Sequence, residues 1–145
     1  MNSNEMTIGY DQKYLVCALV YAVAGMSLGL HMAASQNHAQ FVTHAHALLV
    51  GFVVAFLYAL IHKVWLANGV SRIAGAQFFA HQVGAAAMVV GLFELHDPSV
   101  APRVVELVLA VASATVLAGA LLMLILVIRI AVCRDRRDGE HFMRL

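Results

Sequence analysis

Residues 43–66 read THAHALLVGFVVAFLYALIHKVWL, and this stretch decides the fold. Between its first residue and Lys63 it contains no Asp, Glu, Lys or Arg. A helix needs about 20 mostly apolar residues to cross a hydrocarbon core of about 30 Å. The stretch therefore predicts a helix that spans a membrane, with histidines at both of its ends.

Three other stretches of the chain have the same apolar character. The four predicted spans are residues 14–34, 43–66, 73–95 and 104–132. The connections between them are short, and Pro98 and Pro102 act as helix breakers in the last one. We expect an all-α integral membrane four-helix bundle of up-down-up-down topology. It forms a single transmembrane domain over residues 1–145.

The composition agrees with this class and excludes others. Of 145 residues, 62% are hydrophobic and only 12% are charged, whereas soluble domains have about 25% charged residues. Four spans and short loops use nearly the whole chain, so no separate soluble domain is expected. The net charge of +1 and the lack of a basic face argue against a nucleic-acid partner.

The cationic residues predict the orientation. Those on one side of the predicted topology are Lys13, Lys63, Arg72, Arg129, Arg134, Arg136, Arg137 and Arg144. Arg103 is alone on the other side. Because Lys and Arg concentrate in cytoplasmic segments, both termini are expected in the cytoplasm of a bacterium, with the protein in its inner membrane. Residues 133–145 are expected to form a solvated tail near anionic head groups.

The histidines are the candidate functional residues, because ionisable groups at membrane depth are costly. There are eight. The group expected near the outer face comprises His31, His38, His44, His46 and His96. His81 is the most deeply placed imidazole. His62, next to Lys63 and Trp65, is interpreted as an interfacial anchor, and His141 as a tail residue.

Neutral imidazole is the commonest metal ligand in proteins, so haem held between two histidines is a natural candidate. His31 and His46 lie about equally deep in antiparallel helices and could reach opposite faces of one haem. His44 and His46 point about 200° apart on a helix and cannot both face one site unless the helix begins after them. His81 lies near the level of Tyr21 and Tyr58. That level is either a further ligand position, with Met123 of the fourth span as the partner, or a hydrogen-bonded cluster of His and Tyr that fills the core.

Small and aromatic residues near these histidines have expected roles. Gly51 and Ala55, on the stripe of His44, leave space for a flat macrocycle. The apolar shell expected to exclude water from the iron comprises Leu48, Phe52, Phe56 and Phe79. Gly25 and Gly29 form a GxxxG pair in the first span. Small residues also share a helix face in the third span, where they are Gly84 and Gly91, and in the fourth, where they are Ala110, Ala114 and Ala118. These faces favour close helix packing and a homo-oligomer.

Two segments of the chain carry a resemblance: residues 43–52, followed by Tyr58 and His62, and residues 77–84 (QFFAHQVG). They resemble segments of small four-helix membrane proteins related to haem-copper oxidase subunit I. The resemblance implies a b-type haem or a related metal centre. By this resemblance, His44 or His46 would match a residue of the helix that carries the haem ligand in the oxidases. His81 would match the histidine that follows later in their sequences. The chain lacks the other oxidase helices, with their copper ligands and proton channels, so proton-pumping oxygen reduction is not expected.

The leading hypothesis is thus a haem b protein of the membrane that transfers electrons, or binds or senses O2 or NO, with an unidentified redox partner. The cofactor-binding candidates are His31, His44, His46 and His81. One alternative is a copper or zinc protein that uses His31, Met32, His44 and His46. Another is a cofactor-free subunit that interacts with a membrane protein. No catalytic residue is predicted; an enzyme of this kind would be a haem-dependent oxidoreductase.

Overall fold

The computed structural model describes residues 8–67, 71–95 and 99–142, with side chains as far as residue 134, and these residues form helices and no strand. The elements are α1 (Tyr10–Ser35), α2 (Phe41–His46), the π-helix η1 (Ala47–Val54), α3 (Ala55–Val64), α4 (Arg72–Glu94) and α5 (Pro102–Phe142). The predicted His96 and Pro98 lie outside the described residues.

Four continuous helical stretches are long and apolar enough to cross a membrane. They are Tyr10–Ser35, Phe41–Val64, Arg72–Glu94 and Pro102–Arg134, where the second comprises α2, η1 and α3. The predicted all-α class and its four spanning stretches are confirmed. The chain has the helices of a multi-pass membrane protein.

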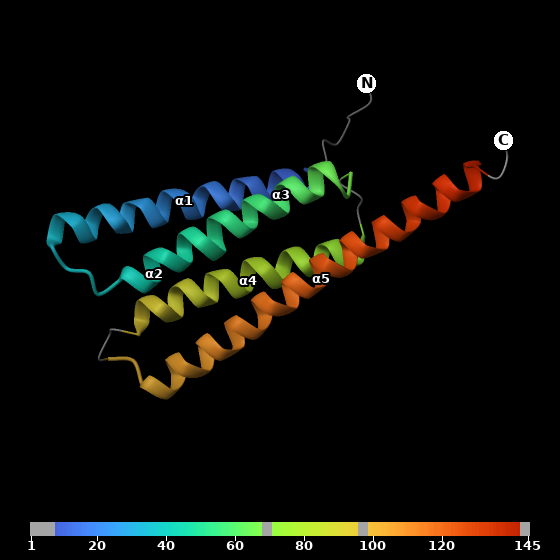
Figure 1. Ribbon diagram of the computed structural model, residues 1–145. Coiled ribbons are helices and arrows are strands. Elements are labelled where there is room, and N and C mark those ends of the chain that lie inside the picture. Colours follow the sequence, from blue (N-terminus) through green and yellow to red (C-terminus); the bar gives the residue numbers. More distant parts are fainter. Residues whose placement is uncertain (1–7, 68–70, 96–98, 143–145) are drawn as a thin grey trace, which may run out of the picture.

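The helices lie in two pairs, α1 beside α2–α3 and α4 beside α5 (Figure 1). In the first pair Tyr14 contacts Tyr58, while the Cα of Gly25 faces Leu48, so the two helices run in opposite directions. The Gln40 amide donates a 3.1 Å hydrogen bond to the carbonyl of Phe93 and so joins the start of α2 to the end of α4. At the other end of the bundle, the Arg134 guanidinium donates to a carbonyl at the end of α3.

The second span is wider in its middle than a regular α-helix. One stripe of buried residues recurs at every fourth position of this span: Thr43, Ala47, Gly51, Ala55 and Ala59. At 3.6 residues per turn such a stripe would drift by about 40° at each step. The i→i+5 bonds of η1 widen the turn, which keeps the stripe against α1. The sequence predicted a regular helix here, so the π-helix is a difference from expectation.

Glycines set the closest helix contacts. A Cβ on Gly51 would overlap the ring of Tyr21, so α1 approaches η1 here. A Cβ on Gly84 would lie 2.9 Å from the backbone nitrogen of Val116, and one on Gly119 would lie 3.1 Å from the backbone nitrogen of His81. The helices α4 and α5 therefore meet nearly backbone to backbone at the level of His81.

Within the single chain, the fourth span differs from expectation in two respects. The alanines expected to pack against another helix, Ala110, Ala114 and Ala118, are all exposed; α5 instead contacts α4 through Ala112 and Val116. The helix also continues past the predicted end at residue 132, as far as Phe142. Most of the predicted tail is thus helical.

Candidate functional site

Five polar or aromatic side chains from three helices meet in the interior of the bundle. Tyr14 comes from α1, Tyr58 and His62 from α3, and Gln77 and His81 from α4. Tyr14, His62, Gln77 and His81 have no exposed surface, and Tyr58 is 8% exposed. We call these five residues the buried polar cluster.

Tyr14 is at the centre of the cluster. Its hydroxyl donates a 2.7 Å hydrogen bond to Oε1 of Gln77. Its ring stacks on His62 with centroids 5.6 Å apart and lies 5.9 Å from the ring of His81. Tyr58 meets His81 edge-on at 4.9 Å. The two imidazoles therefore flank one tyrosine.

The nitrogen atoms of the cluster lack hydrogen-bonding partners among the described residues. These atoms are both ring nitrogens of His62, both ring nitrogens of His81, and Nε2 of Gln77. The Gln77 amide lies close to His62 and the Val50 carbonyl close to His81, but neither contact has hydrogen-bond geometry. An unpaired buried polar group costs about 1–3 kcal/mol, so a native fold that keeps several of them in one place points to a functional site.

The local sequence explains why His81 faces this cluster. Gly84 and Gly119 let the backbones of α4 and α5 come together on one side of α4. His81 lies on nearly the same face of α4 as Gly84, three residues later, and its ring extends from there to Tyr14 and Tyr58 of the first helix pair. Gln77 is four residues earlier and shares that face. At the start of α4, the Ser71 hydroxyl caps the helix by accepting a 3.0 Å bond from the Ala74 N–H.

The predicted ligands are not brought together. His31 is exposed at the end of α1, whereas His44 and His46 are half-buried in α2 and His81 lies in the buried polar cluster. Among the described residues, no group of three or more His, Cys, Asp or Glu side chains could hold a metal ion. The copper or zinc alternative at the outer face, which relied on His31 and Met32 with the α2 histidines, thus finds no support in the geometry.

His44 and His46 nevertheless keep one nitrogen suited to a ligand. Nδ1 of His44 is 2.8 Å from the Gly25 carbonyl, and Nδ1 of His46 is 2.9 Å from the carbonyl of Val42 in its own helix. A carbonyl can only accept, so in the neutral ring the N–H is assigned to Nδ1 and the lone pair to Nε2. The ring of His44 lies over Gly29, where a Cβ would be 2.8 Å from Cε1. The predicted GxxxG contact is thus confirmed, with His44 as part of it.

Three expectations about the surroundings of a haem were wrong. His62 is no interfacial anchor, because it has no exposed surface. The space expected beside Gly51 is occupied by Tyr21. Phe56 and Phe79, expected to form a shell around iron, are 38% and 65% exposed and face outward. Of the predicted site residues, only His81 therefore lies in the interior of the bundle.

Sequence reasoning missed Tyr14, His62 and Gln77 as site residues. Signals for two of them were present. His62 is 18 residues after His44, five full helical turns, and so shares its stripe. Gln77 precedes His81 by one turn and is the first polar residue of that apolar span after Arg72. Tyr14 gave no comparable signal, since tyrosines are common near the ends of membrane helices.

Comparisons of the chain with protein-family models, with curated proteins and with solved structures give no match.

Proposed function

We propose that this chain is a haem b protein of the bacterial inner membrane, which transfers electrons or binds O2 or NO. The single observation that carries the proposal is the pair of fully buried imidazoles, His62 and His81, whose ring nitrogens have no partners among the described residues. Imidazole is the usual axial ligand of b-type haem, and bundle cores are where helical proteins bind such groups.

His81 is the first candidate ligand and His62 the second. Coordination would satisfy one unpaired nitrogen on each ring and so remove part of the cost of burying it. Haem supplies an iron atom that changes oxidation state or takes up a diatomic gas. Two histidine ligands favour electron transfer, and one favours gas binding. His44 and His46, each with Nε2 available, are the further candidates near the predicted outer face, and His31 is the most exposed.

The donors fit an iron porphyrin, but the present packing leaves it little room. The Tyr14 ring lies against both imidazoles. A macrocycle that reached His62 and His81 would require this ring to move aside. A smaller side chain at position 14 should therefore ease haem uptake, which gives the proposal a test besides the loss of ligands.

The proposed arrangement in the membrane is up-down-up-down, with both termini in the cytoplasm. It is supported by the antiparallel contacts within each helix pair. It is also supported by the cationic residues Lys13, Lys63 and Arg134, which lie at the end of the bundle expected to face the cytoplasm. The exposed alanine stripe on α5 supports a homo-oligomer, because small residues let membrane helices approach closely.

The test is an absorption spectrum of detergent-purified protein from haem-replete cells, recorded oxidised and then reduced with dithionite. We expect a Soret band that is lost in His81→Ala and reduced or shifted in His62→Ala. It should persist in His31→Ala, the exposed control, and strengthen in Tyr14→Ala. A colourless protein, even after haem is supplied, would overturn the proposal. A band lost only in His44→Ala or His46→Ala would move the site to the outer end of the bundle.

A second candidate is a cofactor-free protein whose buried polar cluster responds to protons. The specific observation in its favour is that Tyr14 fills the space between the imidazoles and bonds to Gln77. Intramembrane histidines with such neighbours are typical of proton-responsive sites. This candidate predicts a colourless preparation in which His62→Ala and His81→Ala still assemble but lose a pH-dependent change in tyrosine fluorescence. If the tyrosine fluorescence of the wild type does not change with pH, this second candidate is excluded.

A further inference from the structure

The side chain of Tyr10 lies across one end of the buried polar cluster. Tyr10 is the first residue of α1. Its ring centroid lies 5.5 Å from that of His62 on α3 and 5.9 Å from that of Phe78 on α4. Its hydroxyl also reaches α4, where a Cβ on Gly75 would lie 3.0 Å from the oxygen. One side chain of α1 thus extends over both of the other helices that form the cluster.

Tyr10 separates His62 from the end of the bundle. The tyrosine is partly exposed, whereas His62 has no exposed surface. On the inner side, the ring of Tyr14 stacks on His62 with centroids 5.6 Å apart. His62 is therefore enclosed between two tyrosines of one helix. Tyr10 is the one of the two that reaches the surface.

Ring contacts alone hold the side chain of Tyr10 in this position. Its hydroxyl makes no hydrogen bond to a described residue, whereas that of Tyr14 donates to Gln77. On the solvent side, Nζ of the exposed Lys13 lies 5.0 Å from the ring centroid, and cation–π contacts at exposed sites are weak. A tyrosine ring can move by rotation about its own side-chain bonds. Tyr10 can therefore turn away from His62 without breaking a hydrogen bond.

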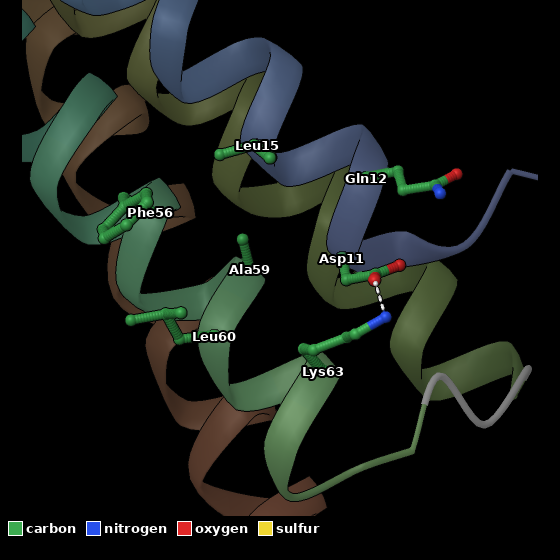
Figure 2. Close-up of a pocket in the computed structure, with 7 residues that line it drawn as sticks. All are labelled: Asp11, Gln12, Leu15, Phe56, Ala59, Leu60 and Lys63. Atoms are coloured by element: carbon green, nitrogen blue, oxygen red, sulfur yellow. Dashed lines mark ion pairs between the residues drawn. The ribbon is translucent and has the colours of Figure 1, made fainter.

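An ion pair holds the helices together beside this ring. The Asp11 carboxylate lies 3.5 Å from Nζ of Lys63, and the pair joins the first turn of α1 to the last turn of α3 (Figure 2). Asp11 follows Tyr10 directly and Lys63 follows His62 directly. The pair therefore keeps α1 against α3 when the Tyr10 ring turns, so that movement of one side chain is enough to uncover His62.

The opposite half of the bundle is apolar and tightly packed. In its described part the buried side chains are apolar as far as Thr43 of α2, and they include Ala22, Ala47, Ala85 and Leu92. A Cβ on Gly51 would overlap the ring of Tyr21 in this half. Interiors lined only by apolar groups stay dry. Polar molecules therefore have their shorter and more polar way to the cluster at the end that carries Tyr10.

We propose that Tyr10 is a lid over the buried polar cluster and that small polar molecules, water first, enter the cluster when its ring turns away. An entering molecule meets the ring nitrogens of His62, which have no hydrogen-bonding partner among the described residues. The same end carries Lys13 and Lys63 and is the one proposed to face the cytoplasm. The inference rests on the assignment of the cluster as the functional site, and it holds for either function proposed above.

The experiment measures how fast each histidine of the full chain is acylated by diethyl pyrocarbonate. The protein is purified in detergent from cells grown without added haem, and mass spectrometry of its peptides gives the rate at each position. In the wild type, His62 should react far more slowly than the exposed His31. Loss of aromatic contacts favours the open state, so Tyr10→Ala should raise the rate at His62 by about tenfold.

Tyr21→Ala is the matched control, because it removes the same ring from the same helix in the apolar half. It should leave the rate at His62 within about twofold of the wild type, since it opens no way to the cluster from the end. His44, half-buried in α2, reports on general loosening and should keep its rate in Tyr10→Ala. A protein without haem or a pH response would contradict the proposed functions, yet this pattern of rates would persist.

A second variant displaces the lid without removing it. Gly75→Val places a side chain where the Tyr10 hydroxyl lies and should also raise the rate at His62. Equal rates at His62 in the wild type, Tyr10→Ala and Gly75→Val would overturn the proposal. So would an equal rise in Tyr21→Ala, or a rise in Tyr10→Ala that His44 shares in full.

Discussion

The hydroxyl of Tyr14 donates a 2.7 Å hydrogen bond to Oε1 of Gln77, 63 positions further along the chain. Both side chains are fully buried. The bond joins α1 to α4 and so ties the first helix pair to the second through their polar interior. In hydrocarbon no water can replace a lost partner, so the bond helps to specify how the two pairs dock.

Tyr14→Phe tests this bond. The substitution keeps the ring contacts and leaves Oε1 of Gln77 buried without a donor, so we expect the free energy of unfolding to fall by about 1–3 kcal/mol. The measurement is unfolding of the detergent-solubilised protein in a denaturing detergent. Tyr21→Phe, whose ring packs on Gly51, is the control and should change stability by less.

A double variant separates the contribution of the hydrogen bond to stability from that of the Tyr14 ring contacts. In Tyr14→Phe with Gln77→Met both polar partners are replaced by apolar groups of similar shape, a change that can be nearly neutral. We expect the double variant to be more stable than Tyr14→Phe alone. Additive losses would show that the hydrogen bond contributes nothing by itself.

Gly51→Ala tests the close approach of α1 to η1. The new Cβ would overlap the Tyr21 ring at atoms close to its backbone, which cannot swing away. Overpacking of this kind costs about 1–3 kcal/mol, and thermal unfolding in detergent should register it. Gly75→Ala is the control, because its Cβ would meet only the Tyr10 hydroxyl, at 3.0 Å. Tyr21→Ala should restore stability to Gly51→Ala, and a failure to do so would place the strain elsewhere.

His81→Leu tests whether the imidazole is kept for stability. In haem-free protein the substitution removes two unpaired buried nitrogens and fills a similar volume. We therefore expect the free energy of unfolding to stay constant or to rise by about 1 kcal/mol. His31→Leu, at an exposed position, should be neutral. A loss above about 2 kcal/mol would mean that His81 has structural partners in the apoprotein and would weaken its assignment as a functional residue.

Cysteine labelling tests the proposed topology. Both variants carry Cys17→Ala, so that each has a single cysteine. The first keeps native Cys133, which is exposed and probes the end of the fourth span. The second combines Asn37→Cys with Cys133→Ser and probes the exposed connection between the first two spans. A membrane-impermeant maleimide added to intact spheroplasts should label position 37 and leave Cys133 unlabelled until the cells are broken. The reverse labelling pattern would show that the protein has the opposite orientation in the membrane.

Much of the fold could be predicted because span length and apolarity are properties of the sequence alone. The predicted spans 14–34 and 73–95 agree closely with Tyr10–Ser35 and Arg72–Glu94. The π-helix η1 was not predicted, and in it Gly51 packs against Tyr21 of α1, a contact that only the three-dimensional structure shows.

The site was harder to predict, because the position of a residue along a span gives its depth in the membrane but not the side of the helix on which its side chain lies. His62 was interpreted as an anchor from its neighbours Lys63 and Trp65. Consecutive residues on a helix point about 100° apart, so the side chains of Lys63 and Trp65 are exposed while His62 points into the core. The haem hypothesis itself stays a prediction, since it rests on the chemistry of imidazole and on the resemblance.

The burial of Gln77 and His81 has a consequence for the biosynthesis of the protein. These polar side chains of α4 contact Tyr14 and Tyr58, from the first helix pair. A nascent α4 that entered the bilayer alone would expose an amide and an imidazole to lipid tails. Synthesis from the N-terminus puts α1 and α3 in place first, so the insertion of the second half of the chain depends on the presence of the first.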